Sequence, residues 1–175
     1  SINVFNFVNI LSMCMFSYNS NYPLTSEQLL IGEPHSSSKG YSFAKRISYL
    51  NVDAYQKIKN KNWINVIPCN IFGLNDNYNL DDSHVIAGLI HKAYIASQSN
   101  IDFEVWGSGE NYRQFIFADD LAEIIYWAKD NWKQNKPLMA VNPKEYKIKD
   151  IIYIIADIFN ISHDRIKFDK TKPNG

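Results

Sequence analysis

The sequence predicts an α/β fold built on a mostly parallel sheet. Strand-like and helix-like segments alternate along the 175 residues, which is the pattern of strand–helix–strand units. Residues 4–12 are apolar and rich in β-branched and aromatic side chains, as expected of a central strand of such a sheet. Hydrophobic residues form 46% of the chain, so a protein of this length can bury a substantial core.

The first half of the chain supplies one helix and a second strand. We expect the helix over residues 41–59. The side chains that fall on or near one face of it are Tyr41, Ala44, Ile47, Ser48, Tyr49 and Ala54. Residues 63–68 form a short apolar run that we expect to be a strand, and Pro68 should end it. The following stretch contains the Asn, Asp and Gly residues of a loop.

The second half continues the alternation. We expect a helix that starts near Asp82 or Ser83, which are good N-caps, and runs to about Ser97. Asp119 or Asp120 should cap another helix. The remaining elements are expected to be strands at residues 102–107, 114–117, 137–142 and 165–169 and a last helix at residues 147–161.

Charge and cysteine content argue against several classes of protein. The 18 basic and 18 acidic residues balance, so we expect neither a nucleic-acid nor a membrane partner. Two cysteines are too few for a disulfide framework and fit a reducing cytoplasm. The apolar stretch at residues 4–16 is too short for a membrane span and lacks the basic flank of a signal peptide. We assign no metal site.

A glycine loop is missing between the first strand and the first helix. A dinucleotide-binding fold opens with such a loop, which brings the pyrophosphate to the helix N-terminus. The seven glycines form neither Gly-x-Gly-x-x-Gly nor Gly-x-x-Gly-x-x-Gly. We therefore expect this chain to be a piece that lacks the N-terminal part of its fold.

Tyr41 and Lys45 are four residues apart, which places them on the same face of the predicted helix. The chain contains 11 tyrosines and the spacing recurs at Tyr55 and Lys59, so spacing alone proves nothing. An ammonium one turn away lowers the pKa of a phenol. Ser12 ends the first strand, where open α/β sheets bind ligands, and its hydroxyl could orient a substrate carbonyl. These residues together predict a ketone-reducing site.

The order Ser…Tyr-x-x-x-Lys resembles the extended short-chain dehydrogenases/reductases. Within that group, four stretches resemble the GDP-L-fucose synthase family: LSMCMF, EPHSSSKGYSFAKR, VIPCNIFGLNDNYNLDDSHVIAGLIHK and VWGSGENYRQFIFADDLA. The resemblance covers nearly all of the chain and implies a doubly wound, Rossmann-like parallel sheet with a smaller C-terminal α/β lobe. Residues 1–78 would belong to an NADP-binding domain. Residues 79–175 would mostly form a substrate-binding lobe, with some strands crossing back.

The resemblance also implies a reaction. The family epimerises C3 and C5 of GDP-4-keto-6-deoxy-D-mannose and reduces C4 with NADPH to give GDP-L-fucose. By resemblance, Cys14 and His84 supply the base and the acid of the epimerisation, and both side chains can exchange a proton close to neutrality. Tyr41 would protonate the new alkoxide at C4.

Other residues match cofactor or substrate contacts by position. The loop beside the nicotinamide would be Pro68, Cys69, Asn70 and Ile71, with cysteine where the family has threonine, and Tyr41, Lys45 and His84 would also contact NADP(H). Substrate contacts would be Lys92, Trp106, Arg113 and Asn174. The cations would face the diphosphate, and the indole would offer an apolar surface. Asn174 replaces a family aspartate, so that contact loses a charge.

Plainer interpretations exist for single residues. Cys14 could be a structural thiol, His84 part of a helix start, Lys92 a solvated helix residue and Trp106 a core residue. Two other functions also stay open: an NAD-dependent nucleotide-sugar 4-epimerase or dehydratase, and a non-catalytic remnant that binds a nucleotide sugar. The family is dimeric through the helix that begins near Tyr41, so we expect a cytoplasmic homodimer. The 175-residue piece alone is expected to be inactive.

Overall fold

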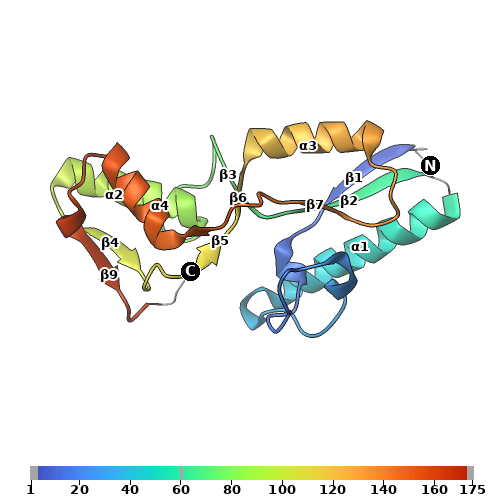
Figure 1. Ribbon diagram of the computed structural model, residues 1–175, viewed down its shortest axis with the longest axis horizontal. Helices are drawn as coiled ribbons and strands as arrows, with labels where there is room; N and C mark the ends of the chain where they lie inside the picture. The colour runs from blue at the N-terminus through green and yellow to red at the C-terminus, as the bar shows by residue number, and fades with distance from the viewer. Residues whose placement is uncertain (1–3, 60, 173–175) are drawn as a thin grey trace. The chain divides into compact units, whose positions relative to one another are not determined.

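The computed structural model describes residues 4–59 and 61–172, and the chain forms two compact units (Figure 1). Unit 1 comprises Ser1–Ile71 and Ile116–Asn142, and unit 2 comprises Phe72–Phe115 and Pro143–Gly175. The chain therefore crosses between the units three times. The first crossing precedes the domain boundary expected after residue 78, and residues 116–142 return to unit 1.

Unit 1 contains a parallel sheet of three strands in the order β1-β2-β7. The strands are β1 (Asn6–Ile10), β2 (Asn62–Pro68) and β7 (Leu138–Ala140), each within or close to a predicted strand. β2 lies in the middle and is buried over five consecutive residues, as its apolar run predicts. Because all three strands are parallel, their carboxyl ends share one edge of the sheet.

Two helices cover opposite faces of this sheet (Figure 1). α1 (Lys39–Lys59) packs against β1 and β2 on one face, and α3 (Ala118–Asn131) packs against the same strands on the other. This confirms the doubly wound α/β arrangement. The cap predicted for α3 is wrong: the helix starts after Phe117, and Asp119 and Asp120 lie in its first turn. There, both carboxylates interact favourably with the positive end of the helix dipole.

The buried face of α1 is not the one that its apolar residues mark. Tyr41, Ile47 and Ala54 are exposed, whereas Ser42 and Arg46 are 0% and 6% exposed. The buried polar groups have internal partners, such as the carbonyl of Ser38, which accepts from the Ser42 hydroxyl at 2.8 Å. Apolar periodicity finds the core-facing side only when that side is apolar, which explains the difference.

A buried polar network joins β1, β2 and α1. The Asn9 amide donates to Asn65 Oδ1 at 2.8 Å, and the Ser48 hydroxyl donates to Asn9 Oδ1 at 3.0 Å. Asn9 and Asn65 lie opposite each other in the strand register and are 8% and 5% exposed. A shift of register by one residue would turn these amides away from each other, so the network specifies the pairing.

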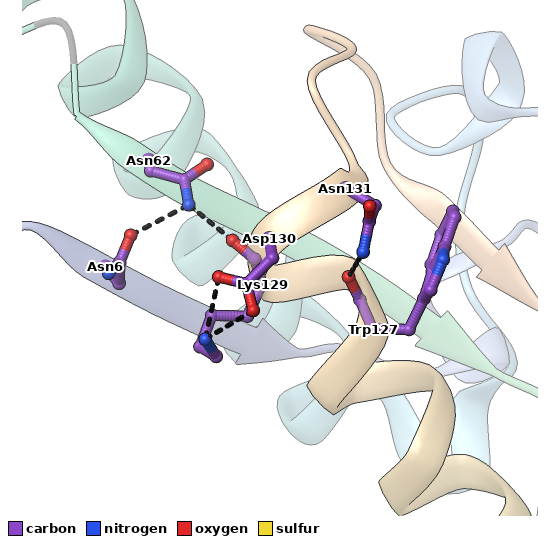
Figure 2. A network of polar contacts seen from close by, with 6 residues as sticks. All are labelled: Asn6, Asn62, Trp127, Lys129, Asp130 and Asn131. Carbon is purple, nitrogen blue, oxygen red and sulfur yellow. Dashed lines mark hydrogen bonds and ion pairs between the residues drawn. The ribbon is translucent and has the colours of Figure 1, made fainter.

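Asparagines also tie the amino ends of β1 and β2 to the last turn of α3 (Figure 2). The Asn62 side chain donates to Asn6 Oδ1 at 2.8 Å and to the Lys129 carbonyl at 2.6 Å. In the same turn, the Asn131 amide donates to the Trp127 carbonyl at 2.8 Å. The Asn62 side chain thus satisfies the Lys129 carbonyl, one of those that the end of a helix leaves without intrahelical partners.

The connection from β1 to α1 is long but tightly bonded. It contains three 3₁₀ turns, η1 (Met13–Met15), η2 (Ser26–Gln28) and η3 (Ser36–Ser38). Ser17 and Pro34 form an antiparallel bridge across it. Gly32 has a φ of +67°, and a Cβ there would lie 2.8 Å from the Ser17 hydroxyl, so the close approach requires glycine. A small core underlies it, made of Leu11, Met15, Phe16, Leu29 and Ile67.

Unit 2 combines short strands with two helices. β4 (Phe103–Trp106) pairs in parallel with β9 (Ile166–Asp169), and β5 (Tyr112–Arg113) pairs antiparallel with β8 (Tyr146–Lys147). α2 (Val85–Ser99) packs on α4 (Ile148–Ile158) and on β4, around the buried Phe103 and Ile152. A 3₁₀ turn, η4 (His163–Arg165), precedes β9.

Two predictions about element ends and short strands are wrong. α2 starts after His84, which is its N-cap residue, and not at Asp82 or Ser83. The stretch expected to be loop contains β3 (Asn70–Phe72), which pairs with β6 (Phe115–Phe117). Strands of two or three residues, such as β3, β5 and β8, are too short to show a period in the sequence.

The Gly107-Ser108-Gly109 turn has a structural task. It follows β4, and both glycines have positive φ, 78° and 72°. The Gly109 carbonyl accepts from Lys149 N at 2.8 Å, and a Cβ on Gly109 would lie 3.2 Å from the Lys149 Cα. The turn therefore packs on the first turn of α4, where a side chain would not fit. Within the described residues, no helix has the length and apolarity needed to cross a bilayer.

Candidate active site

The first part of the site lies just beyond β1. Ser12 is the N-cap of η1, and its hydroxyl accepts a hydrogen bond from Cys14 N at 3.2 Å. The cap places Cys14 in the middle of the 3₁₀ turn, and its side chain is exposed. The interpretation of Cys14 as a buried structural thiol is therefore wrong.

Tyr41 and Lys45 lie on the first turns of α1 and reach the same end of β1. The Lys45 ammonium donates to the carbonyl of Ile10, the last residue of β1, at 2.8 Å. It also lies 5.6 Å from the centre of the Tyr41 ring. Tyr41 is 52% exposed, so its phenol is open to a ligand. Helical spacing thus brings Tyr41 and Lys45 together, and the bond to Ile10 places Lys45 at the end of β1.

The second Tyr-x-x-x-Lys pair has a different setting. The Tyr55 ring stacks on Trp63 with centroids 4.9 Å apart, near the amino end of β2. Ligands of open α/β sheets bind at the opposite, carboxyl edge. Stacking on Trp63 therefore gives Tyr55 a structural role, away from the edge where ligands bind.

The stretch after β2 reaches the same edge of the sheet as η1. Pro68 ends β2, and Cys69 N donates to the Ala140 carbonyl of β7 at 3.1 Å. The Cys69 thiol is 5% exposed, and burial raises its pKa, although a hydrogen bond with the Asn142 backbone opposes the shift. Asn70 and Ile71 follow in β3, and both are exposed. The buried thiol fills space in the core.

In unit 2, two of the predicted substrate residues lie together. The Lys92 ammonium, on α2, sits 4.6 Å from the centre of the Trp106 ring at the end of β4. Partial burial lowers the pKa of Lys92, and the carboxylate of Glu104 opposes the shift. Trp106 is 52% exposed, so it is not the core residue of its plainer interpretation. A half-buried ammonium beside an open indole face is a suitable site for an anion next to an apolar or planar group.

The other predicted residues of unit 2 are placed singly. His84 is exposed at the N-cap of α2, and its carbonyl accepts from Gly88 N at 2.9 Å. Arg113 is half-buried on β5 and donates from Nη1 to the Tyr112 carbonyl at 2.9 Å. Asn174 lies outside the described residues.

Two cations near these groups escaped sequence reasoning. Arg46 directly follows Lys45 and is buried, and the rarity of arginine in the chain is the signal that could have drawn attention to it. The Lys172 ammonium lies 5.7 Å from the centre of the Trp106 ring. No helical or strand pattern in the sequence singles out Arg46 or Lys172.

Comparison with known proteins gives consistent matches. The chain is 37% identical over 175 residues to a GDP-L-fucose synthase of Dictyostelium discoideum, covering 99% of this chain and 54% of the relative. A probable GDP-L-fucose synthase of Drosophila melanogaster is 36% identical over 177 residues, covering 96% and 55%. A solved GDP-L-fucose synthetase from Naegleria fowleri bound to NADP has a TM-score of 0.91 at 35% identity, covering 98% and 56%. The chain thus spans about half the length of the relatives that it matches.

The family match covers most of this chain and both of its units. It extends over residues 1–146, which include the end of β1, the Tyr41–Lys45 pair and the Lys92–Trp106 pair. The solved relative shares the α/β fold with its parallel sheet. With fold, motif and alignment in agreement, this chain belongs to the NAD dependent epimerase/dehydratase family.

Proposed function

We propose that this chain carries the catalytic groups of a GDP-L-fucose synthase. Such an enzyme epimerises C3 and C5 of GDP-4-keto-6-deoxy-D-mannose and then reduces the ketone at C4. The observation that carries the proposal is the gathering of Tyr41, Lys45 and the Ser12–Cys14 turn at the carboxyl end of β1. Relatives named GDP-L-fucose synthase at 36% and 37% identity support the choice of substrate.

The reduction needs a proton for the oxygen at C4. Tyr41 supplies it from an exposed phenol, and the Lys45 ammonium favours the phenolate that remains. Lys45 is held in place by the Ile10 carbonyl, so its charge stays beside the ring. The Ser12 hydroxyl lies at the same strand end and orients the ketone by a hydrogen bond.

The residues of unit 1 fit a nicotinamide cofactor. Three parallel strands end at one edge, and Lys45, Tyr41 and the Pro68–Ile71 stretch offer an ammonium, a phenol and backbone groups near that edge. NADPH supplies a hydride when it is bound. His84, Asn70 and the backbone of Cys69 are proposed to contact the cofactor as well. These roles make unit 1 the main part of the cofactor domain and unit 2 the main part of the substrate lobe.

The two inversions need a base and an acid. The 4-ketone makes the hydrogens on C3 and C5 acidic, so a base removes each as a proton and an enolate forms on the sugar. Cys14 is exposed in its turn and His84 is exposed at the start of α2, and we assign them to these two tasks. The Cys14–His84 pair distinguishes this reaction from simple 4-epimerisation, which leaves both residues idle.

The nucleotide end of the substrate carries a diphosphate. Lys92 and Arg113 are assigned to its charges, and Trp106 to an apolar or stacking contact beside Lys92. Asn174 stands in place of a family aspartate, so its contact lacks a charge. The proposed compartment is the cytoplasm.

The exposed face of α1 supports a homodimer. Phe43, Ile47, Leu50 and Ala54 are spaced as one helical stripe, and the first three are 36%, 60% and 46% exposed. A contiguous apolar stripe on a helix is typical of an interface with another protein surface. A second copy of α1 presents the same stripe, so a two-fold contact would bury both.

The proposal is tested by product analysis with the complete natural protein. Incubation with GDP-4-keto-6-deoxy-D-mannose and NADPH should give GDP-L-fucose, identified by NMR of the sugar ring. A parallel incubation of UDP-galactose with NAD⁺ tests the alternative 4-epimerase. Conversion of UDP-galactose only would favour that alternative, and binding without any conversion would favour a non-catalytic role.

A further inference from the structure

Arg46 is a buried cation to which the proposed chemistry gives no task. It directly follows Lys45 on α1 and is 6% exposed. Its guanidinium donates to three backbone carbonyls: Nε to Met15 O at 2.8 Å, Nη1 to Gly32 O at 2.8 Å and Nη2 to Ile31 O at 3.3 Å. A buried charge is costly unless its donors are satisfied, so this arrangement is specific rather than incidental.

The three carbonyls belong to two different stretches of the β1–α1 connection. Met15 is the last residue of η1, the turn that carries Cys14. Ile31 and Gly32 lie in the loop that leads to η3 and α1. Arg46 therefore ties the turn of the thiol to the helix of the phenol, and braces both against the intervening loop.

Lysine cannot replace this set of bonds. A guanidinium carries donors on three nitrogens in one rigid plane, whereas an ammonium is a single point with no fork. The ring of Phe43 lies 5.6 Å from the guanidinium carbon and covers it further. Burial lowers the pKa of Arg46, and the carboxylate of Glu33 opposes the shift.

Lys45 does not depend on Arg46 for its position. Its ammonium is bonded to the Ile10 carbonyl at 2.8 Å, on β1 itself. The placement of the Tyr41–Lys45 pair and the placement of Cys14 are thus fixed by different bonds. A change at Arg46 should disturb the thiol and leave the phenol–ammonium pair in place.

We propose that Arg46 is a positioning residue that holds Cys14 at the distance from the sugar that the inversions require. This inference rests on the proposed function, in which Cys14 exchanges protons with the sugar. A general loss of stability would weaken both proton exchange and cofactor binding, whereas a positioning role for Arg46 affects only proton exchange. Proton exchange at C3 and C5 should depend on Arg46, and binding of the cofactor at Tyr41 and Lys45 should not.

The test uses Arg46→Lys and Arg46→Met in the complete natural protein. Arg165→Lys is the matched control, because Arg165 also donates to backbone carbonyls, those of Ala96 and Ile101, but in unit 2. Three quantities are measured for each variant: deuterium uptake at C3 and C5 of the keto sugar in D₂O without NADPH, the Kd for NADP⁺, and the melting temperature.

Arg46→Lys should slow uptake at saturating substrate by about tenfold or more, since small misplacements of a catalytic group have effects of this size. Its Kd for NADP⁺ should stay within about twofold of the wild-type value, because the bond of Lys45 to β1 is intact. Arg165→Lys should lower the melting temperature without slowing uptake. Arg46→Met should slow uptake at least as much as Arg46→Lys does, and if it does not fold, Arg46→Lys decides the question.

Wild-type uptake in Arg46→Lys would overturn the inference. The inference would also be overturned if Arg46→Lys and Arg46→Met lost deuterium uptake and affinity for NADP⁺ together, in proportion to the fall in melting temperature. Arg46 would then have a structural role only. The wild-type protein reports on the proposed function separately. If it shows no uptake, the proposed function fails before any variant is compared.

Discussion

Tyr41 and Cys14 lie near the end of the same strand but are proposed to act on different atoms of the sugar. The phenol is held beside an ammonium that is bonded to β1, and the thiol is held in a turn that Ser12 caps. Each side chain is exposed. Because different bonds hold the phenol and the thiol, we expect that a mutation can impair the reduction without the inversions, or the inversions without the reduction.

Replacing Tyr41 by phenylalanine removes the proton donor for C4. We expect oxidation of NADPH with the keto sugar to fall by about 10²-fold or more, the usual loss for a general acid. Tyr55→Phe is the matched control on the same helix, because Tyr55 stacks on Trp63 at the other end of the sheet. Equal rates for the two variants, measured at 340 nm, would remove Tyr41 from the mechanism.

If Lys92 binds the substrate as proposed, substrate binding should be sensitive to alkaline pH. Burial lowers its pKa below the ordinary value, so its positive charge is lost at a lower pH than that of a free lysine. The KM for the GDP-sugar should therefore begin to rise with pH before an ordinary lysine titrates. In Lys92→Arg, whose charge persists, the rise in KM should be absent. A rise of the same size in both proteins would show that another group is responsible.

At the scale of elements, polar bonds hold the sheet together beside its apolar packing. Asn9 bonds to Asn65 across the strands and accepts from Ser48 on α1. The same network fixes how α1, with Tyr41 and Lys45, lies against β1. Elements that carry catalytic groups are in this way held by bonds that hydrophobic patterns do not reveal.

Asn9→Ala should destabilise the protein by about 1–3 kcal/mol, the cost of leaving buried partners unsatisfied. Asn6→Ala is the control on the same strand, since the bond of Asn6 to Asn62 is exposed and its loss should cost less. Urea denaturation of the complete natural protein measures both changes. Equal losses for Asn9→Ala and Asn6→Ala would show that burial of the network adds no stability.

The difference between apolar patterns and polar bonds also separates what the sequence could predict from what it could not. The long apolar runs and helical spacings of β1, β2, α1 and α4 are strong periodic signals, and the structure has these elements. The buried side of α1 could not be predicted in full, because beside Val52 it carries the polar residues Ser42 and Arg46. Caps set by backbone geometry and strands of two or three residues leave no periodic pattern.

Part of the candidate site follows from spacing, and part does not. Tyr41 and Lys45 meet because helical residues four apart share a face. Ser12 follows the last residue of β1 by two positions and caps η1. The pairing of Lys92 with Trp106 joins a helix and a strand, which no local pattern encodes. The same holds for Arg46, whose partners are 14 to 31 residues away.

At the scale of the whole molecule, the apolar stripe on α1 predicts the assembly. Ile47→Glu puts a charge in the middle of the proposed two-fold contact and should convert the dimer to a monomer. Ile158→Glu is the matched control, since Ile158 is also exposed, at 70%, on α4 of unit 2. Sedimentation velocity distinguishes the outcomes. A dimer that survives Ile47→Glu would place the interface elsewhere.

In the proposed function, the groups at the end of β1 act on a nucleotide sugar with a ketone at C4. Reduction alone would need only the tyrosine and the lysine. We propose that the exposed thiol in a capped turn adds proton exchange at C3 and C5.

The most direct test is NMR of GDP-4-keto-6-deoxy-D-mannose incubated in D₂O with the complete natural protein and no reduced cofactor. Deuterium should enter at C3 and C5, and Cys14→Ser should slow the uptake strongly while Tyr41→Phe leaves it within about tenfold of the wild-type rate. Absence of uptake with the wild-type protein, or uptake that is indifferent to Cys14, would contradict the proposed function.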